Sequence, residues 1–439
     1  MEAQVSTGTY GTTPLQQGLP KDVLTKDKPT GPFSFYDAKN FKEGERPHVP
    51  CHIPLNDLNK KRTFTKDTIF SDFEEQKTGD LKLIDKELKD KQKGVLITVF
   101  KEAASKLVEG KGIVGLSLPV RIFEPRSSIE RLADLFLYCN HYLMKAAGSD
   151  EPHERIKYIM GFVIAAVPHA ISQYKPFNPL LGETFQATLE DGTTIDCEHT
   201  SHHPPIMNYY VKSHLYTVYG CFTINGEIHA NSINAFNEGW GTVQFMDGHK
   251  VKFTLPNLYI WGMIMGSRGL QVTSAINVVD QQNGLKGVLK YSADVKKGLT
   301  SYFSSPRTDV VRGAIYKYDQ KKHSDIMAKH KDKWLPMLND LAEMPDSIRV
   351  INKVEGSWLR EIRVDGEMLW NINDDPKYAQ HLKMTENPLP SDCRFREDLI
   401  WLWRKNEELA QIWKIKLEEQ QRHERALRKK VADKRSPKK

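Results

Sequence analysis

The feature that most restricts the fold of this chain is a long succession of short β-strands between about residues 183 and 320. The segment TFQATLEDGTTIDCEH alternates around an Asp-Gly pair, a pattern typical of a β-hairpin. The strand pattern continues, broken by Asn-Gly, Asp-Gly or Gly, through NYYVKSHLYTVYGCFTINGEIHANSINAF, GWGTVQFMDGHKVKFTLPNLYIWGMIMG and KGVLKYSADV. Another strand pair is expected in WLREIRVDGEMLW. Consecutive strands with such frequent turns predict one large antiparallel sheet or barrel, flanked by helices.

An amphipathic helix is predicted ahead of the strands, from Val95 to Val108. Its apolar residues recur at i, i+4, i+7 and i+11, which places them on one helix face. These residues are Leu96, Phe100, Ala103 and Leu107. Gly110 is placed to end the helix. Packing of this face as an ordinary core helix and its use as a cover for an apolar opening are both compatible with the pattern.

More helices are expected before and after the strands. SSIERLADLFLYCNHYLMKAA and ERIKYIMGFVIAAVPHAISQY read as two helices, the first capped by Ser127 or Ser128. A long final helix is predicted from Arg396 to Lys430 because Glu, Gln, Lys, Arg and Leu dominate there.

Composition separates the chain into a core and two unlike ends. Residues 1–65 are rich in Thr, Gly, Pro and Lys and are expected to be extended or disordered. Residues 66–94 read as a charged linker, helical in part, and residues 95–430 as the folded domain. Lys414 to Lys439 hold eleven Lys and Arg against four Asp and Glu, which equals the net +7 of the whole chain. This final segment, including the tail at residues 431–439, predicts contact with an anionic surface, a membrane or a nucleic acid, unless it only aids solubility.

Other features favour a cytoplasmic protein. No apolar run is long enough to span a membrane, and the first residues have neither the basic start nor the apolar centre of a secretory signal. The five cysteines are scattered without a CxxC pair, as is typical of reduced thiols.

The stretch CEHTSHHPP, residues 197–205, is the strongest candidate for a site. It offers Cys197, His199, His202 and His203 as metal ligands, but adjacent histidines on an extended segment point to opposite faces. A catalytic histidine would need a nucleophile and an orienting acid, and the chain has no recognisable nucleophile, phosphate-loop or zinc-protease motif. We therefore expect neither a metal nor an enzyme.

An anion site remains, because histidine N–H groups can donate to phosphate oxygens. Such a site also needs Lys or Arg from elsewhere in the chain. Lys175 lies in the rigid turn YKPFNPLLGE, and Lys414, Glu418 and Arg422 recur every four residues on one helix face. From the spacing alone, an ordinary solvated salt-bridge face is the favoured interpretation of Lys414 to Arg422, and a surface-loop lysine is the alternative for Lys175.

TSHHPP and KPFNPLLGETF resemble the signature of the oxysterol-binding-protein-related family of lipid-transfer proteins. The resemblance extends over about residues 95 to 430. It includes SLPVRIFEPRSSIERL, PNLYIWGMIMG, KGVLKYS, LPSDCRFREDL and the final Lys-x-x-x-Glu-x-x-x-Arg helix. It implies a short form without a pleckstrin-homology or ankyrin module. The usual acidic-Gln-Val/Thr lead-in to the histidine pair is here Glu198-His199-Thr200, so His199 departs from the family pattern.

The resemblance implies a nearly complete antiparallel β-barrel around an apolar lipid tunnel, with an N-terminal helical lid at residues 95–120. Phosphatidylinositol 4-phosphate is the ligand most widely shared in the family. Leu118 of the SLP segment would line the tunnel near an acyl chain. The residues implied to bind the lipid head group are Lys175, Asn178, His202, His203, Lys414, Glu418 and Arg422.

The expected function is therefore exchange of phosphatidylinositol 4-phosphate for a second lipid, a sterol or phosphatidylserine, between membranes. Neither a cofactor nor nucleic acid is expected to take part, and the protein is expected to be peripheral at membranes or membrane contact sites. SFYDAKN is similar, through Phe35, Asp37 and Ala38, to the motif that docks onto VAMP-associated adaptor proteins. A sterol sensor and a ligand-independent membrane adaptor are the alternatives.

Overall fold

A computed structural model describes residues 59, 65–108, 118–202, 204–293, 307–319, 321 and 348–435. His203, the adaptor-like motif at Phe35, Asp37 and Ala38, and the last four residues of the basic tail lie outside this range. In the part of the chain that is described, no helix is both long and apolar enough to cross a membrane.

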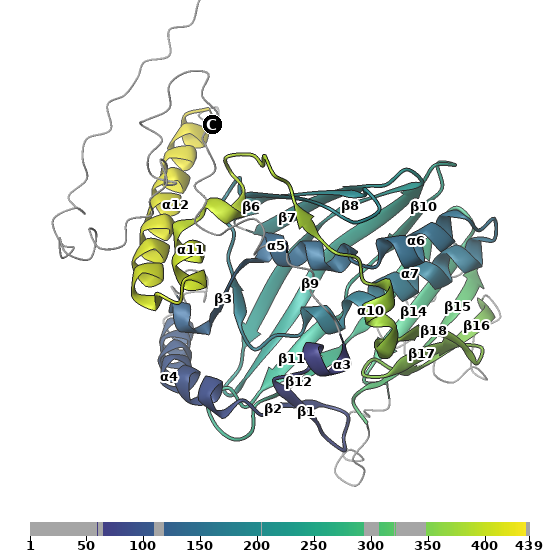
Figure 1. The fold of residues 1–439 in the computed structure, drawn as a ribbon, viewed down its shortest axis with the longest axis horizontal. Coiled ribbons are helices and arrows are strands. Elements are labelled where there is room, and N and C mark those ends of the chain that lie inside the picture. The colour runs from purple at the N-terminus through teal and green to yellow at the C-terminus, as the bar shows by residue number, and fades with distance from the viewer. Residues whose placement is uncertain are drawn as a thin grey trace, which may run out of the picture.

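Most of the described chain forms one large antiparallel sheet of seventeen strands, as the hairpin pattern predicts (Figure 1). Asp-Gly pairs make the turns of three hairpins, and their glycines, Gly192, Gly248 and Gly366, have the positive φ that these turns require. The strands are β1 (Phe73–Glu75), β2 (Leu81–Leu83), β5 (Thr184–Thr188), β6 (Thr194–His202), β7 (Pro205–Lys212), β8 (Tyr216–Ile228), β9 (Ser232–Phe245), β10 (Lys250–Phe253), β11 (Asn257–Trp261), β12 (Gly269–Thr273), β13 (Ala275–Asp280), β14 (Leu285–Tyr291), β15 (Val310–Tyr318), β16 (Ile348–Ser357), β17 (Glu361–Val364), β18 (Glu367–Asn371) and β19 (Lys383–Met384).

The sheet is strongly curved but is not closed by hydrogen bonds. Neighbours pair in sequence order from β5 to β9, and β9 then pairs with β11 along its first half and β10 along its second. The ladder continues from β13 to β18 on one side, while β19 lies beyond β5 on the other. No described pairing joins β18 to β19. The predicted mainly-β fold with flanking helices is confirmed, whereas the nearly complete barrel is not.

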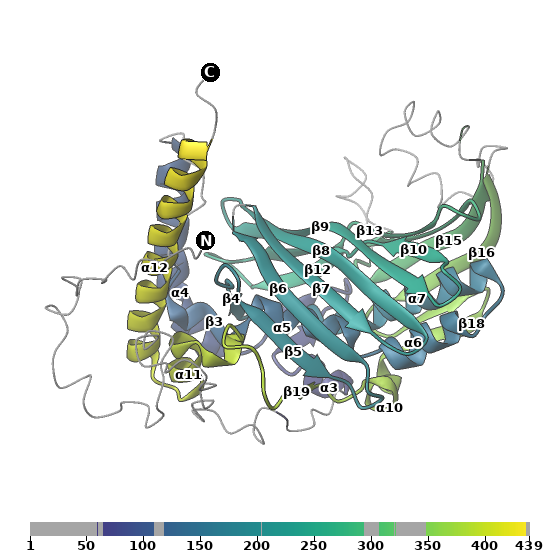
Figure 2. The ribbon, with the colours of Figure 1, turned by 90° about the horizontal axis from the view of Figure 1, so that it is seen from above.

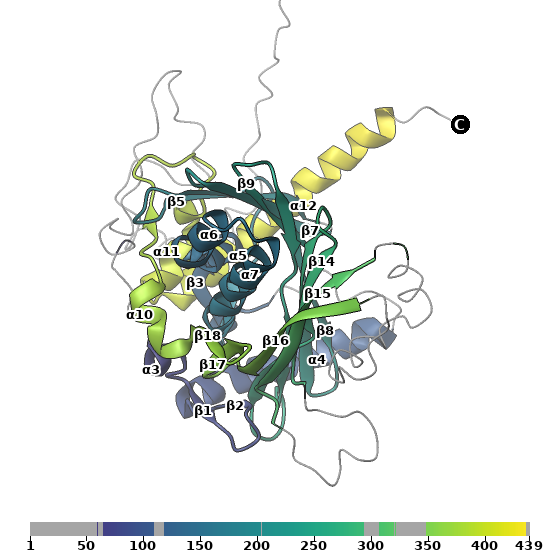
Figure 3. The same cartoon turned by 90° about the vertical axis from the view of Figure 1, so that its right-hand side faces the viewer.

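The helices α5 (Ser128–Ala133), α6 (Cys139–Ala147) and α7 (Pro152–Ala166) lie inside the curve of the sheet (Figure 3). Phe162 of α7 meets Phe253 of β10 edge to face, with ring centroids 5.7 Å apart. At Gly287 of β14 an added Cβ would lie 2.6 Å from the sulfur of Met160 and 2.8 Å from Ile156 Cγ2, so a larger residue there would require these side chains of α7 to shift. These helices therefore fill one end of the concave face.

Two predicted element boundaries are wrong at the ends of the domain. The N-terminal helix, α4, extends from Lys86 to Val108 and so begins before Val95. The predicted final helix is divided into α11 (Glu397–Trp403) and α12 (Glu407–Arg435), because Lys405 adopts a positive φ of 61° and Asn406 starts a new helix by accepting a bond from the Leu409 N–H. Figure 2 shows α4 and α12 at the same end of the molecule.

Two local expectations are also corrected. Ser127 precedes α5, but its hydroxyl does not cap the helix; it donates to Glu183 at 2.5 Å instead. Asn225-Gly226 does not break a strand, since both residues lie within β8 and pair with β9. Ser127 thus contacts a distant segment in place of its own helix, and Asn225-Gly226 is held extended by its pairing with β9.

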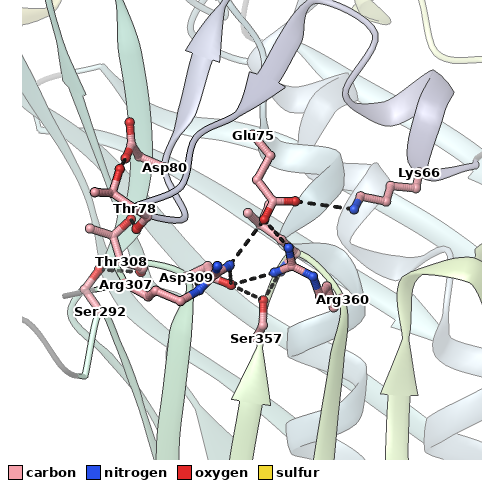
Figure 4. A network of polar contacts seen from close by, with 11 residues as sticks. Lys66, Glu75, Thr78, Asp80, Ser292, Arg307, Thr308, Asp309, Ser357 and Arg360 are labelled. Carbon is pink, nitrogen blue, oxygen red and sulfur yellow. Dashed lines mark hydrogen bonds and ion pairs between the residues drawn. The ribbon is translucent and has the colours of Figure 1, made fainter. Parts of the chain in front are cut away.

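The stretch expected to be a charged linker contains α3 (Lys66–Ile69), the hairpin of β1 and β2, and the start of α4. β2 adds to the sheet beside β12, and Leu81 and Leu83 are buried. A polar network at the other end of the hairpin joins Glu75 to Arg307 and Arg360, which also bind the buried carboxylate of Asp309 (Figure 4). The chain leading into α4 is therefore fixed to the sheet.

Candidate anion-binding site

Two lysines from distant parts of the chain meet over one aromatic ring. Lys175 lies in β4 (Lys175–Phe177), which pairs in parallel with β3 (Phe123–Ser127), and Lys414 lies in α12. Their Nζ atoms are 5.0 Å and 5.5 Å from the centroid of the Phe123 ring. The electron-rich face of a ring favours cations at such distances. The structure thus brings together two residues that the sequence assigned to one site.

The Lys175 amine has an excess of positive charge around it. It donates to the Pro176 carbonyl at 3.0 Å and to Asn178 Oδ1 at 2.5 Å, and no carboxylate of the described residues lies within ion-pair distance. Loss of hydration, followed by the charges of Lys414 and Arg396, lowers its pKa to about 7. An added anion would relieve this repulsion, so the surroundings of Lys175 favour anion binding.

Glu418 is the carboxylate nearest to this pair of lysines in the described structure. It forms an ion pair with Lys414, which is buried, and accepts from Arg422 at 3.2 Å. Arg422 is more than half exposed and lies one turn further along α12. The three residues therefore share one helix face, where Glu418 pairs with both Lys414 and Arg422.

The loop after β4 is held by buried charges that the sequence analysis did not assign. Arg396 donates to the Asn178 carbonyl and to Glu183, both at 2.8 Å, and forms a two-bond pair with Asp398. Glu183 also accepts from the Leu180 N–H at 2.7 Å. Because Arg396 and Glu183 are far apart in sequence, no local pattern could have identified their pairing. Together they fix the loop that carries Asn178 and directly follows the strand of Lys175.

His199 and His202 lie next to this loop. The Gly182 N–H donates to the His199 carbonyl at 2.8 Å, and the His199 N–H donates to the Glu183 carbonyl at 2.9 Å. The two imidazole rings are hydrogen-bonded to each other, with His199 Nε2 3.2 Å from His202 Nδ1. His199 is buried, and burial together with the charge of His202 lowers its pKa to about 4. His199, noted in the sequence only as a departure from a family pattern, is thus in direct contact with a predicted site residue.

An apolar surface continues from the helix-filled part of the concave face toward the strand ends. Phe222 of β8 is buried against Phe253, and the residues that follow on the same side, Ile224 and Ile228, are partly exposed. Their neighbours Ile233, Leu258 and Ile260 are also only partly buried. Leu118, predicted to contact an acyl chain, is partly buried against the same core, close to where Val120 binds Gln411 of α12.

Of the four candidate metal ligands, Cys197, His199 and His202 are described and His203 is not. Across the described parts of the chain no group of three or more His, Cys, Asp or Glu side chains is arranged to hold a metal ion. Cys197 is buried, and burial raises the pKa of its thiol well above the usual value. A thiol that stays protonated is a weak ligand and a poor nucleophile.

Solved structures share this fold. The chain is similar to the Osh3 ORD from Saccharomyces cerevisiae, solved in complex with PI(4)P, with a TM-score of 0.56 and 22% identity over 74% of this chain and 84% of that chain. It is also similar to the Osh1 ORD domain, solved in complex with cholesterol, with a TM-score of 0.55 and 19% identity over 74% of this chain and 78% of that one. The fold is that of the Osh ORD domains.

Sequence comparison defines the family. The family model described as Oxysterol-binding protein matches residues 103–438. Oxysterol-binding protein 9 of Dictyostelium discoideum is 31% identical over 82% of each chain. Oxysterol-binding protein-related protein 8 of Mus musculus is 26% identical over 48% of this chain. The matched part covers only 24% of that longer relative. This chain belongs to the oxysterol-binding protein family, whose members bind or transfer lipids, and it carries the family's lipid-binding domain.

Proposed function

We propose that the protein is a lipid carrier that extracts phosphatidylinositol 4-phosphate from one membrane and exchanges it for a second lipid at another. The observation that carries this proposal is the pair of lysines at Phe123, where Lys175 has a lowered pKa and Lys414 is buried. A phosphorylated inositol ring supplies the negative charge that this site lacks. Asn178 is bonded to Lys175 and Glu418 pairs with Lys414 and Arg422, and these three residues would contact the ring hydroxyls and phosphate.

The apolar surface of β8, β9 and β11 is suited to the lipid tails. Each CH₂ group removed from water contributes about 0.8 kcal/mol, so a diacyl lipid gains stability wherever such a surface covers it. Ile224, Ile228 and Leu258 supply part of this surface, and Leu118 lies against the same core. The Osh3 ORD was solved with PI(4)P, which supports the choice of first lipid.

The second lipid is proposed to be a sterol or phosphatidylserine. The Osh1 ORD domain was solved with cholesterol and also with ergosterol, which supports a sterol. In this proposal residues 95–120 act as the lid of a domain that extends to residue 430, and the basic tail at residues 431–439 attracts the open site to anionic membranes. Docking onto VAMP-associated adaptors would proceed through Phe35, Asp37 and Ala38.

Removal of the histidine pair tests this proposal. The His202→Ala, His203→Ala double variant should lose extraction of phosphatidylinositol 4-phosphate from vesicles by at least about tenfold, because charge-assisted hydrogen bonds contribute about 1.5–3 kcal/mol each. Uptake of the second lipid should change little. His214→Ala, at an exposed histidine, is the matched control. Equal loss of both lipids would contradict the proposed division of the site.

Native mass spectrometry of the purified protein distinguishes the alternative functions. A bound phosphoinositide supports the exchange function, and a sterol or phosphatidylserine as second species identifies the exchanged lipid. A sterol without any phosphoinositide would favour a sterol sensor. Protein that takes up no lipid from mixed vesicles would favour a ligand-independent adaptor and overturn the proposal.

A further inference from the structure

Arg268 is a buried cation without a counter-charge. It directly precedes β12 and is 4% exposed. Among the described residues its guanidinium has one hydrogen-bond partner, Gln92 of α4, whose Oε1 accepts from Nη1 at 2.5 Å, and Nε has none. Burial lowers the pKa of Arg268, and no neighbouring carboxylate of the described chain opposes this effect. An unpaired charge in a protein interior is costly, so its presence points to a missing anionic partner.

The strand register places Arg268 on the concave face of the sheet. β12 pairs with β11 so that Leu270 lies opposite Ile260, and residues directly opposite each other share a face. Arg268 is two residues before Leu270 and therefore belongs to the same face. The Leu83 N–H donates to the Arg268 carbonyl at 2.9 Å, which continues the pairing of β12 with β2 through Arg268. Its side chain thus shares a face with the partly exposed apolar residues of β8, β9 and β11.

The backbone at Arg268 is positioned by two neighbouring segments. Gly262, at the end of β11, has a positive φ of 68°, and an added Cβ there would lie 2.9 Å from Arg268 Cα. The turn between β11 and β12 is held by Asn231, whose Oδ1 accepts from the N–H groups of Ile264 and Met265. The location of the guanidinium therefore does not depend on a free loop.

The cation lies where an apolar strip of the concave face ends. Along β11 the strip runs from Leu258 to Ile260, away from the buried Phe222 at the helix-filled end. Arg268 lies two residues further in the same direction, beyond the end of β11. An amphipathic ligand with its tails on this strip would therefore place a polar group at Arg268.

Gln92 joins this cation to the segment that carries Lys175. The Gln92 amide accepts from Arg268 through its oxygen and donates through its nitrogen to the Gln173 carbonyl at 3.4 Å. Gln173 is two residues before Lys175. Gln92 is neutral, so it orients the guanidinium without supplying the missing negative charge.

The chemistry of the guanidinium defines the class of ligand. A guanidinium has donors only, so its partner must be an acceptor. An anionic oxygen also supplies the opposite charge, and such charge-assisted bonds are the stronger ones. A glycerophospholipid has an anionic phosphodiester directly beside its apolar tails, whereas a sterol has one neutral hydroxyl and would leave the charge unpaired.

We propose that Arg268 binds the phosphodiester of a glycerophospholipid whose tails lie on the concave face, and that it thereby selects such a lipid over a sterol. The proposal rests on the proposed function, because it concerns the lipid that the protein carries. Phosphatidylinositol 4-phosphate and phosphatidylserine both contain this phosphodiester, and separate uptake measurements distinguish them.

Arg268→Met tests the proposal because it keeps a long side chain but removes the charge and the donors. The full-length protein is incubated with phosphatidylcholine vesicles that contain phosphatidylinositol 4-phosphate, phosphatidylserine or cholesterol, and bound lipid is measured by native mass spectrometry. We expect uptake of at least one of the two anionic lipids to fall roughly tenfold, the effect of losing a charge-assisted hydrogen bond. Cholesterol uptake should not fall. Arg268→Lys, which keeps the charge, should lose less than Arg268→Met.

The matched control is Arg349→Met, at an exposed arginine of β16, which should leave all three uptakes unchanged. A loss confined to one anionic lipid supports the proposal and identifies that lipid as the ligand of Arg268. Unchanged uptake of both anionic lipids in Arg268→Met overturns the proposal. An equal loss of all three lipids also overturns it, because a purely structural role of Arg268 would have that effect.

The unmodified protein provides a second measurement that does not depend on Arg268→Met folding. In ¹H–¹⁵N spectra of arginine-labelled protein, the Nε–H signal of Arg268 is the one absent from Arg268→Lys. We expect this signal to shift when either anionic lipid is loaded and to stay in place with cholesterol. Uptake of both anionic lipids without a shift overturns the proposal alone. A shift with phosphatidylserine, in a protein that takes up no phosphatidylinositol 4-phosphate, would count against the proposed exchange function alone.

Discussion

Lys175 is the residue whose chemistry depends most on its neighbours. A lysine amine in water has a pKa near 10.4, but loss of hydration and the charges of Lys414 and Arg396 lower that of Lys175 to about 7. Glu418 opposes this effect only in part. The amine is therefore partly deprotonated in the empty site and becomes fully protonated when an anion binds. Proton uptake should accompany binding near neutral pH.

This coupling predicts the pH dependence of binding. The protonated amine is the form that binds an anion. The contribution of Lys175 to the affinity for phosphatidylinositol 4-phosphate vesicles should therefore be fully present below pH 7 and fall as the pH rises toward 8.5. We expect a loss of about tenfold per pH unit above the pKa from this one group. The second ionisation of a phosphate monoester, with a pKa near 6, acts in the opposite direction and is nearly complete above pH 7.

Lys175→Arg tests the assignment to this amine, because an arginine side chain does not titrate in this range. Its binding curve, measured by vesicle flotation between pH 6.5 and 8.5, should be flatter than that of the unmodified protein. Lys252→Arg, at an exposed lysine of β10, is the control and should leave the curve unchanged. An equally steep curve in Lys175→Arg would assign the dependence to another group.

At the scale of elements, the β1–β2 hairpin determines how α4 is attached to the sheet. β2 pairs with β12, Phe70 packs edge to face on Trp358, and the network around Asp309 holds the hairpin from the other side. Asp309 is fully buried and accepts from Ser357 at 2.5 Å as well as from two arginines. A buried carboxylate with this many charged partners is costly to alter.

Asp309→Asn should therefore lower the free energy of unfolding by about 2–3 kcal/mol, the contribution of charge-assisted hydrogen bonds. Urea denaturation measures this change, with Asp90→Asn at an exposed position of α4 as the control. Hydrogen exchange should become faster in residues 73–83 and in the first turns of α4. Exchange that stays unchanged there would mean that the network does not anchor the hairpin.

On the scale of the whole molecule, charge and chemistry are concentrated at one end. α4 and α12 lie at the same end (Figures 1 and 2), where Glu407 of α12 pairs with Lys91 of α4 and with Arg121. The excess positive charge of the chain lies between Lys414 and Lys439, which includes most of α12. A membrane attracted to this helix would meet the molecule at the end that carries the candidate site.

Neutralising part of this charge should weaken membrane binding more than neutralising the same charge elsewhere. The triple variant Lys429→Gln, Lys430→Gln, Lys434→Gln should bind phosphatidylserine vesicles at least about tenfold more weakly, at roughly 1 kcal/mol per cation near the surface. Lys252→Gln, Lys317→Gln, Lys383→Gln has the same net charge and is the matched control. Equal weakening in both would indicate a general charge effect, and the difference should shrink in high salt.

The sequence by itself determined the features that depend on neighbours along the chain. Asp-Gly pairs predicted hairpins because their backbone adopts the turn without strain, and the spacing of Leu96 and Phe100 predicted one buried helix face, which both residues occupy. The motifs around Lys175 and His202 identified the family, which the comparisons confirm.

Only the tertiary structure decided how distant segments meet. The pairing of Arg396 with Glu183, the bulge that turns His199 toward His202, and the placement of Lys175 beside Lys414 all join segments far apart or depend on strand register. The same holds for the extent of the sheet, which remains open between β18 and β19 in the described chain. Long-range packing sets these contacts, and with them the local electric field and the pKa of Lys175, so no short stretch of sequence contains them.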